Sequence, residues 1–170
     1  MRSPGTRTKV YVDTNIYLYA ILHHPQYGQV CAEVLRDLGR GLFSAYGSTL
    51  VAIELLGALS KINPHIARRA LEDYMALPIT ILELDETVLM VAALINEVVN
   101  VRYDAVHAAL MALNGISNVI TNDLDDWAKL ARRFQDVIGH LQEEGYDVLI
   151  SAIEVVSPDT YVSWRRGLQP

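Results

Sequence analysis

The sequence lacks several features that mark particular protein classes. Cys31 is the only cysteine in 170 residues, so an internal disulfide is excluded and we expect a cytoplasmic location. No apolar run reaches the roughly 18 residues that a transmembrane helix needs, and the polar start of the chain differs from a secretory signal. A Gly-rich phosphate loop, a zinc-ligand spacing and a Ser-His-Asp set are all missing. We therefore expect a soluble protein that does not bind nucleotides through a Gly-rich loop.

The composition is that of a folded domain. Hydrophobic residues make up 51% of the chain and charged residues 20%, a balance that argues against global disorder. The length suits one domain with a sizeable core, so we predict a disordered tail over 1–8 and a single domain over 9–170. The net charge of −6 argues against a plain electrostatic nucleic-acid binder. That argument loses force if divalent cations bind several of the acids and invert the local potential.

Short β-branched or apolar runs alternate with longer helical patterns along the chain. The short runs predict strands at 9–12, 42–46, 79–84, 117–121 and 148–156. The longer patterns predict helices at 16–23, 25–39, 49–60, 64–77, 87–99 and 105–113, one from 125 to as far as 144, and a short final helix. This alternation predicts an α/β protein whose mostly parallel sheet is covered by helices on both faces.

Two polar residues, Asp13 and Asn15, directly follow the first predicted strand. In open α/β sheets, ligands bind outside the carboxyl ends of the strands. A carboxylate is a poor choice for packing at such a position, because it loses hydration unless a cation or a hydrogen-bond donor meets it. We therefore interpret Asp13 as part of a binding site rather than only a helix cap.

Further acids occupy the ends of other predicted elements. Glu54 lies among apolar neighbours, so we expect its carboxylate to lie close to the core, where an unpaired charge is costly. Asp104 follows the connector 100–103 and opens a helix, Asp123 ends the fourth strand, and Asp126 follows Asp123 at i+3. Clustered carboxylates repel one another, and Mg²⁺ or Mn²⁺ would hold them together. This pattern predicts metal-assisted hydrolysis of phosphodiester bonds.

Four stretches of the chain resemble, in order, the motifs of PIN-domain ribonucleases. They are VYVDTNIYLYA at 10–20, STLVAIEL at 48–55, YDAVHAA at 103–109 and VITNDLDDW at 119–127. The resemblance implies a three-layer α/β/α sandwich with a central, mostly parallel sheet. It also implies a Mg²⁺- or Mn²⁺-dependent endoribonuclease that acts on RNA and is similar to VapC-type toxins, which an antitoxin protein blocks and which commonly form homodimers.

The same resemblance assigns roles to particular residues. It implies four acids that bind the metal and carry catalysis: Asp13, Glu54, Asp104 and Asp123. It also implies that Asn15 and Thr121 are polar supports that orient these acids. Asp125 and Asp126 compete for the role of an auxiliary metal ligand, and we favour Asp126 because it directly precedes the aromatic Trp127.

Some residues have two interpretations at this stage. His107 stands one turn after Asp104 amid Ala and Val, and we interpret it as a packed or surface residue rather than a site residue. Three arginine pairs either line an RNA path, because phosphates need cations, or belong to the solvated surface: Arg68–Arg69, Arg132–Arg133 and Arg165–Arg166. Residues 135–152 have the character of an insertion, to which the sequence assigns no role.

Two other functions compete with the nuclease. One is a PIN-like module that binds RNA or a protein without cleaving RNA, and the intact set of acids argues against it. The other is a phosphatase of a different α/β fold, whose first motif also begins with an Asp at a strand end. Those enzymes need a second Asp two residues later, where this chain has Asn15.

Overall fold

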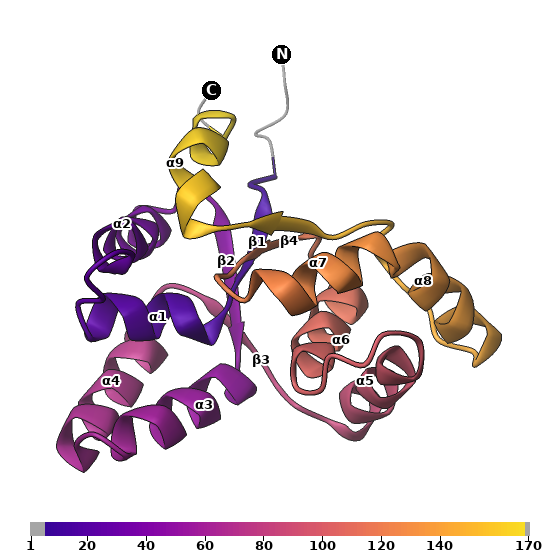
Figure 1. The fold of residues 1–170 in the computed structure, drawn as a ribbon, viewed down its shortest axis with the longest axis horizontal. Coiled ribbons are helices and arrows are strands. Elements are labelled where there is room, and N and C mark those ends of the chain that lie inside the picture. The colour runs from indigo at the N-terminus through magenta and orange to yellow at the C-terminus, as the bar shows by residue number, and fades with distance from the viewer. Residues whose placement is uncertain (1–5, 169–170) are drawn as a thin grey trace.

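A five-stranded sheet forms the centre of the protein, as a computed structural model that describes residues 6–168 shows (Figure 1). Its strands are β1 (Lys9–Val12), β2 (Ser44–Ser48), β3 (Thr80–Leu82), β4 (Asn118–Ile120) and β5 (Glu154–Val156). Their order is β3-β2-β1-β4-β5, and every neighbouring pair is parallel. Residues 1–5 of the predicted tail lie outside the described residues, so the tail stays a prediction.

Helices cover both faces of the sheet (Figure 1). One side carries α1 (Thr14–Ile21), α2 (Gly28–Gly39), α3 (Thr49–Ser60) and α4 (Pro64–Ala76), and α9 (Pro158–Arg166) packs on α2. The other side carries α5 (Glu86–Val98), α6 (Asp104–Asn114), α7 (Leu124–Arg132) and α8 (Phe134–Glu143). The predicted three-layer α/β/α sandwich is therefore confirmed. Within the described residues, no helix is both long and apolar enough to cross a membrane.

The central strand β1 explains why the sheet is parallel and covered. Val10, Tyr11 and Val12 are completely buried, as expected for a strand that packs helices on both faces. The helices begin where the sequence offers caps: the side chains of Ser48 and Asp85 accept hydrogen bonds from the first-turn amides of α3 and α5.

The position of β1 also sets the point at which the strand order reverses. The chain runs from β1 to β2 and β3 on one side, then crosses to β4 and β5 on the other. The Asp13 amide donates to the Ile120 carbonyl over 3.0 Å, so the segments that follow β1 and β4 stay side by side. This reversal of strand order is the place where doubly wound sheets bind ligands.

Three predicted boundaries were wrong. The second helix begins at Gly28 rather than at residue 25, after a turn in which the His24 ring accepts hydrogen bonds from the Gln26 and Tyr27 amides. The helix expected from 125 to as far as 144 breaks at Arg133, which lets Phe134 turn into the core.

The third correction concerns the last strand. It spans only 154–156 of the predicted 148–156. Leu149 is 64% exposed and its amide donates to the Ala112 carbonyl at the end of α6. This apolar segment therefore closes the end of a helix and does not extend the sheet.

Candidate metal centre

Asp13 lies at the carboxyl end of β1 and is almost completely buried, with 4% of its surface exposed. Its Oδ1 accepts a hydrogen bond from the Thr14 amide over 2.7 Å, so Asp13 caps α1. Its Oδ2 accepts hydrogen bonds from the Thr121 hydroxyl over 2.7 Å and from the Asn15 side-chain amide over 3.3 Å. Donors therefore stabilise this buried carboxylate on both oxygens.

Asn15 and Thr121 connect the segments that follow β1 and β4. The Asn15 side-chain amide donates to the Thr121 hydroxyl over 3.2 Å, and its carbonyl accepts from the Asn122 backbone amide over 2.9 Å. The Thr121 hydroxyl also accepts a hydrogen bond from the Asp123 amide over 3.1 Å. These bonds fix the backbone of residues 121–123 relative to Asp13.

Three further carboxylates converge beside this segment. One oxygen each of Asp104, Asp123 and Asp126 lies within 4.8 Å of the other two, although α6 supplies the first and the β4–α7 segment the others. Asp104 and Asp126 are half-buried and Asp123 is exposed. Asp125 is exposed and does not belong to this group. We name these three residues the acid cluster.

The electrostatics of Asp104 reflect the crowding of like charges. Burial raises the pKa of the Asp104 carboxyl to about 8, and the negative charge of Asp13 and the hydrogen bond and charge of Asp123 act in the same direction. The nearby His107 imidazole opposes this shift only in part. A divalent cation is the ligand that would reverse the repulsion, because carboxylate oxygens are the donors that Mg²⁺ and Mn²⁺ prefer.

Glu54 reaches the site from α3 and not from the core. Its side chain is 37% exposed and its helical neighbours Ile53 and Leu56 face solvent, so the carboxylate lies at the edge of the core and not within it. Glu54 Oε1 accepts a hydrogen bond from the Thr14 hydroxyl over 3.2 Å and lies 2.7 Å from His107 Nε2. Through Thr14 and His107, the acid is thus linked to the segment that carries Asp13.

His107 is the residue whose place sequence reasoning missed. It is packed, as one interpretation held, with 1% of its surface exposed, but it also contacts the site: its Nε2 lies 3.7 Å from Asp13 Oδ1. Burial alone lowers the pKa of His107, but the hydrogen bond with Glu54 and the charges of Asp13, Glu54 and Asp104 outweigh burial and raise it. Its spacing of three residues from Asp104 was the available signal, since i and i+3 share one helix face.

Cations border the acid cluster on one side. Lys129 Nζ lies 3.2 Å from one oxygen of Asp126, and an Arg102 guanidinium nitrogen lies 3.7 Å from the other. Arg102 has a φ of 54°, in the left-handed region, which costs a non-glycine residue about 1 kcal/mol or more. The Asn96 side chain holds this turn by accepting from the Val101 amide and donating to the Arg102 carbonyl.

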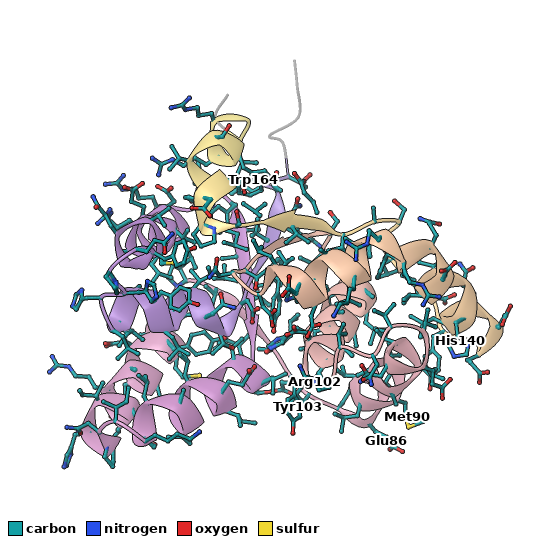
Figure 2. The ribbon with its side chains drawn as sticks, viewed as in Figure 1. Glu86, Met90, Arg102, Tyr103, His140 and Trp164 are labelled. Carbon is teal, nitrogen blue, oxygen red and sulfur yellow. The ribbon has the colours of Figure 1, made fainter. Side chains whose placement is uncertain are left out.

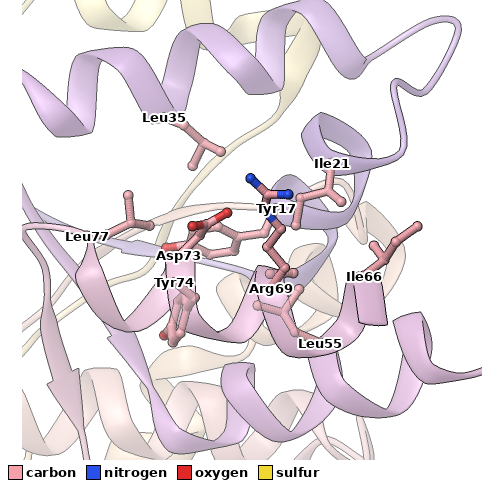
Figure 3. A pocket seen from close by; sticks show the side chains of 10 residues that line it. Tyr17, Ile21, Leu35, Leu55, Ile66, Arg69, Asp73, Tyr74 and Leu77 are labelled. Carbon is pink, nitrogen blue, oxygen red and sulfur yellow. The ribbon is translucent and has the colours of Figure 1, made fainter. Parts of the chain in front are cut away.

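A largely apolar pocket lies elsewhere on the described surface. It measures about 300 Å³ and is enclosed by residues of α1, α2, α3 and α4, as Figure 3 shows. Tyr17, Leu35, Leu55 and Tyr74 contribute to its lining, and none of the predicted acids does. This pocket has too few carboxylates for a magnesium site, so the acid cluster remains the candidate.

Fold and geometry together define a class: an all-parallel α/β protein with clustered acids at the point where the strand order reverses. The PIN domain model matches residues 10–133, which include all of the predicted site. The chain therefore belongs to the PIN domain family. No curated protein matches the sequence significantly.

Solved structures of low identity share this fold. A DNA-bound VapBC from Salmonella typhimurium aligns with a TM-score of 0.60 and 17% identity, covering 89% of this chain and 98% of that chain. VapBC2 from Rickettsia felis, bound to a fragment of its promoter DNA, gives 0.56 and 19%, covering 72% and 92%. Mycobacterium tuberculosis VapC20, a toxin that cleaves the sarcin–ricin loop, gives 0.58 and 17%, covering 70% and 93%.

Proposed function

We propose that this protein is a Mg²⁺- or Mn²⁺-dependent endoribonuclease that hydrolyses phosphodiester bonds of RNA. The observation that carries the proposal is the convergence of Asp104, Asp123 and Asp126 within 4.8 Å of one another, next to the buried Asp13. Membership of the PIN domain family supports it, because that family typically consists of metal-dependent nucleases.

The residues present fit a hard divalent cation. The donor set consists of carboxylates only, and burial together with the charges of Asp13 and Asp123 raises the pKa of Asp104, an effect that a bound divalent cation would oppose. Five acids would hold one or two ions: Asp13, Glu54, Asp104, Asp123 and Asp126. When bound, Mg²⁺ or Mn²⁺ acidifies water and offsets negative charge at the scissile phosphate.

The other residues of the site position these acids. Thr121 and Asn15 donate to the same oxygen of Asp13, and this leaves the second oxygen turned toward α1 and His107. His107 contacts Glu54 over 2.7 Å and so fixes a side chain that would otherwise move freely in water. We assign these three residues a positioning role, because none of them adds a carboxylate to the cluster.

Replacement of one acid tests the nuclease. We expect Asp13→Asn to abolish cleavage of a mixed-sequence RNA in Mg²⁺ or Mn²⁺. The fold is expected to survive, because the amide oxygen still caps α1 and relief of repulsion offsets the loss of the hydrogen bonds that Thr121 and Asn15 donate to the other oxygen. Asp125→Asn is the matched control, since Asp125 is exposed and outside the acid cluster. Cleavage by Asp13→Asn at the wild-type rate, or RNA binding without cleavage by the wild-type protein in any divalent metal, would contradict the proposal.

We also propose that the protein is the toxin of a VapBC-type pair, with an antitoxin partner. The supporting observation is that two of the similar structures are VapBC complexes. Expression of the chain in a bacterial host is expected to arrest growth, and co-expression of a small DNA-binding protein encoded directly upstream is expected to restore it. Growth arrest by the Asp13→Asn variant would contradict a toxin that acts by cleavage. The homodimer and the cytoplasmic location stay predictions.

A further inference from the structure

Cations are unevenly arranged around the acid cluster. The chain has 14 Lys and Arg residues and a net charge of −6, so its surface as a whole repels nucleic acid. Lys129 and Arg132 follow Asp126 at i+3 and i+6 on α7, which places all three on one side of that helix. We name Lys129 and Arg132 the cationic stripe.

A surface pocket lies along this stripe. Its volume is about 250 Å³, and it is lined by both residues of the stripe, by Arg133 and by residues 98–100. Arg133 is already engaged, because its guanidinium donates to the Val98 carbonyl over 2.8 Å and contacts Asp136 over 3.1 Å. Arg132 is exposed and forms no ion pair with the other described residues. Its charge is therefore available to an anionic ligand.

The structure distinguishes the three arginine pairs, for which the sequence allowed the same two interpretations. Arg165 binds Asp37 and Glu33, where it holds α9 against α2. Arg68 forms an exposed pair with Glu72 on α4, the helix that borders the apolar pocket. Of these arginines, only Arg132 lies on the helix that also carries an acid of the cluster. The pair at 132–133 is therefore the one whose position suits a substrate.

The turn before α6 adds an aromatic side chain to this edge of the site. Tyr103 directly precedes Asp104 and is 77% exposed, the highest value among the large hydrophobic side chains of the described residues. Arg102 and Tyr103 lie together at the start of α6 (Figure 2). The turn continues from residues 98–100, which line the pocket of the cationic stripe. We name Arg102 and Tyr103 the site turn.

The backbone of the site turn also indicates a function. Arg102 adopts a left-handed conformation that glycine would adopt without cost, and Asn96 holds it there. Strain of this kind persists mainly where a side chain is needed at that position. The left-handed turn carries a guanidinium 3.7 Å from Asp126 and, next to it in the chain, an exposed aromatic ring. Both are features that bind unpaired nucleotides.

We propose that an unpaired RNA strand enters the acid cluster across the site turn and continues along the cationic stripe. Tyr103 stacks on a base next to the scissile phosphate, and Arg102 contacts that side of the backbone. Asp126 and Arg132 are separated by about 9 Å along α7, so Arg132, unpaired among the described residues, meets a phosphate beyond the scissile one. Lys129 meets the phosphate between them by exchanging its contact with Asp126 for the substrate. The proposal rests on the proposed nuclease function and identifies the residues that carry the strand past the acid cluster.

Binding measurements without cleavage test the path directly. The probe is a fluorescein-labelled 12-nucleotide RNA of mixed, non-self-complementary sequence, and the protein is the full chain carrying Asp104→Asn in Mg²⁺ buffer. Fluorescence anisotropy over a range of salt concentrations gives the affinity and its salt dependence. Circular dichroism melts of each variant confirm that it folds, which we expect because the side chains varied in the Asp104→Asn background are all exposed.

Tyr103→Ala tests stacking in that background. Stacking of one base on an aromatic ring corresponds to a loss of roughly 5- to 100-fold in affinity, and Tyr103→Trp is expected to restore it. The same substitution leaves affinity for a perfect RNA duplex unchanged, because paired bases do not stack on the ring. Unchanged affinity of Tyr103→Ala for the single strand would overturn this part of the path.

Lys129→Gln and Arg132→Gln test the cationic stripe. Each is expected to lower affinity at low salt and to reduce the slope of log affinity against log salt by about 0.7. Arg68→Gln is the matched control, since it removes an exposed helical cation from another surface. Equal behaviour of the stripe variants and this control would overturn the proposal, and so would an Asp104→Asn protein that binds no RNA at low salt.

Arg102→Gly separates function from stability. It relieves the left-handed strain, so we expect a higher melting temperature together with weaker RNA binding; His23→Gly, at the other described non-glycine residue with positive φ, is expected to change stability alone. Unchanged RNA binding by Arg102→Gly would overturn a substrate role for Arg102.

Kinetics distinguish this proposal from the nuclease proposal. In the otherwise wild-type chain, Tyr103→Ala and Arg132→Gln are expected to raise KM more than they lower kcat. If these two variants cut RNA with the KM of the wild-type protein, the proposed RNA path is refuted and the nuclease proposal is unaffected. Binding that depends on Tyr103 and Arg132 in a protein that cuts no RNA would support the path and refute the nuclease.

Discussion

His107 Nε2 lies 2.7 Å from Glu54 Oε1, although 53 residues separate the two along the chain. The other ring nitrogen of His107 lies 2.6 Å from the Tyr11 hydroxyl, which in turn lies 2.7 Å from Ser48 Oγ. A hydrogen-bonded series thus runs from the buried end of β2 through β1 and α6 to a half-exposed acid on α3. Such a series orients its last member, because each partner is fixed by the one before it.

Replacing the imidazole by an apolar group of similar size tests this series. We expect His107→Leu to lower the free energy of unfolding by about 1–3 kcal/mol, because two hydrogen bonds are lost while Tyr11 keeps its bond with Ser48. Mn²⁺ affinity, measured by calorimetry, is expected to fall because Glu54 is no longer held. His65→Leu, on the exposed side of α4, should change stability by no more than about 0.5 kcal/mol. Unaltered Mn²⁺ affinity in His107→Leu would show that the series does not serve the site.

The two adjacent acids of α7 are expected to differ in metal binding. Asp126 belongs to the acid cluster and is half-buried, whereas Asp125 is exposed and outside it. Asp126→Asn should therefore weaken Mn²⁺ binding roughly 10-fold, and Asp125→Asn should leave it unchanged. Calorimetric titration of both variants measures this difference. The reverse ranking would assign the auxiliary role to Asp125.

Stability of the metal-free protein is expected to depend on the protonation of Asp104. Its folded-state pKa of about 8 lies above the unfolded value near 4. The contribution of this group is therefore fully present below about pH 4 and is lost as pH rises towards 8. Melting temperatures in EDTA should fall across that range, and added Mg²⁺ should raise them most at the alkaline end.

Two variants identify the group responsible for this pH dependence. Asp104→Asn cannot ionise, so its melting temperature in EDTA should vary less with pH than that of the wild-type protein. Asp159→Asn, an exposed first-turn acid of α9, should behave like the wild type. A pH profile that Asp104→Asn leaves unaltered would rule out Asp104 as the titrating group.

The parts of the fold that local chemistry determines were predictable from the sequence. Val10 to Val12 are β-branched or aromatic and form the buried central strand, and the caps at Ser48 and Asp85 start the helices where expected. The alternation of strands and helices then restricts the architecture to a covered parallel sheet. Gly115, with a φ of 68°, ends α6 at the predicted position because an L-residue resists that conformation.

The remaining features depend on contacts between distant segments. Glu54 was expected close to the core because its sequence neighbours are apolar. Ile53 and Leu56 are nevertheless exposed, so apolar neighbours in the sequence did not indicate how deeply a residue of α3 is buried. The spacing of His107 from Asp104 indicated its helix face, but its partners Glu54 on α3 and Tyr11 on β1 come from distant segments. The left-handed position is occupied by Arg102 and not by Gly or Asn, the residues that would have indicated such a turn in the sequence. The side chain of Asn96, six residues earlier, holds the turn instead.

The close approach of α4 to β2 gives a last prediction, at Gly47. A methyl group on Gly47 would collide with the Tyr74 hydroxyl. That hydroxyl accepts from the Ser48 amide over 2.9 Å and donates to the Ser48 carbonyl over 3.1 Å, immediately before α3 begins. We expect Gly47→Ala to lower the free energy of unfolding by about 2–4 kcal/mol, through the overlap itself and the loss of both hydrogen bonds.

A double-mutant cycle separates this overlap from the general cost of replacing a glycine. In Tyr74→Phe the hydroxyl is absent, so Gly47→Ala should cost about 1 kcal/mol less in that background than in the wild type. Gly57→Ala is the control, because Gly57 lies within α3 with no atom near its would-be methyl group. That control should stabilise the protein by roughly 0.5–1 kcal/mol. Additive effects of Gly47→Ala and Tyr74→Phe in urea unfolding would show that the tyrosine hydroxyl is not what excludes a side chain from β2.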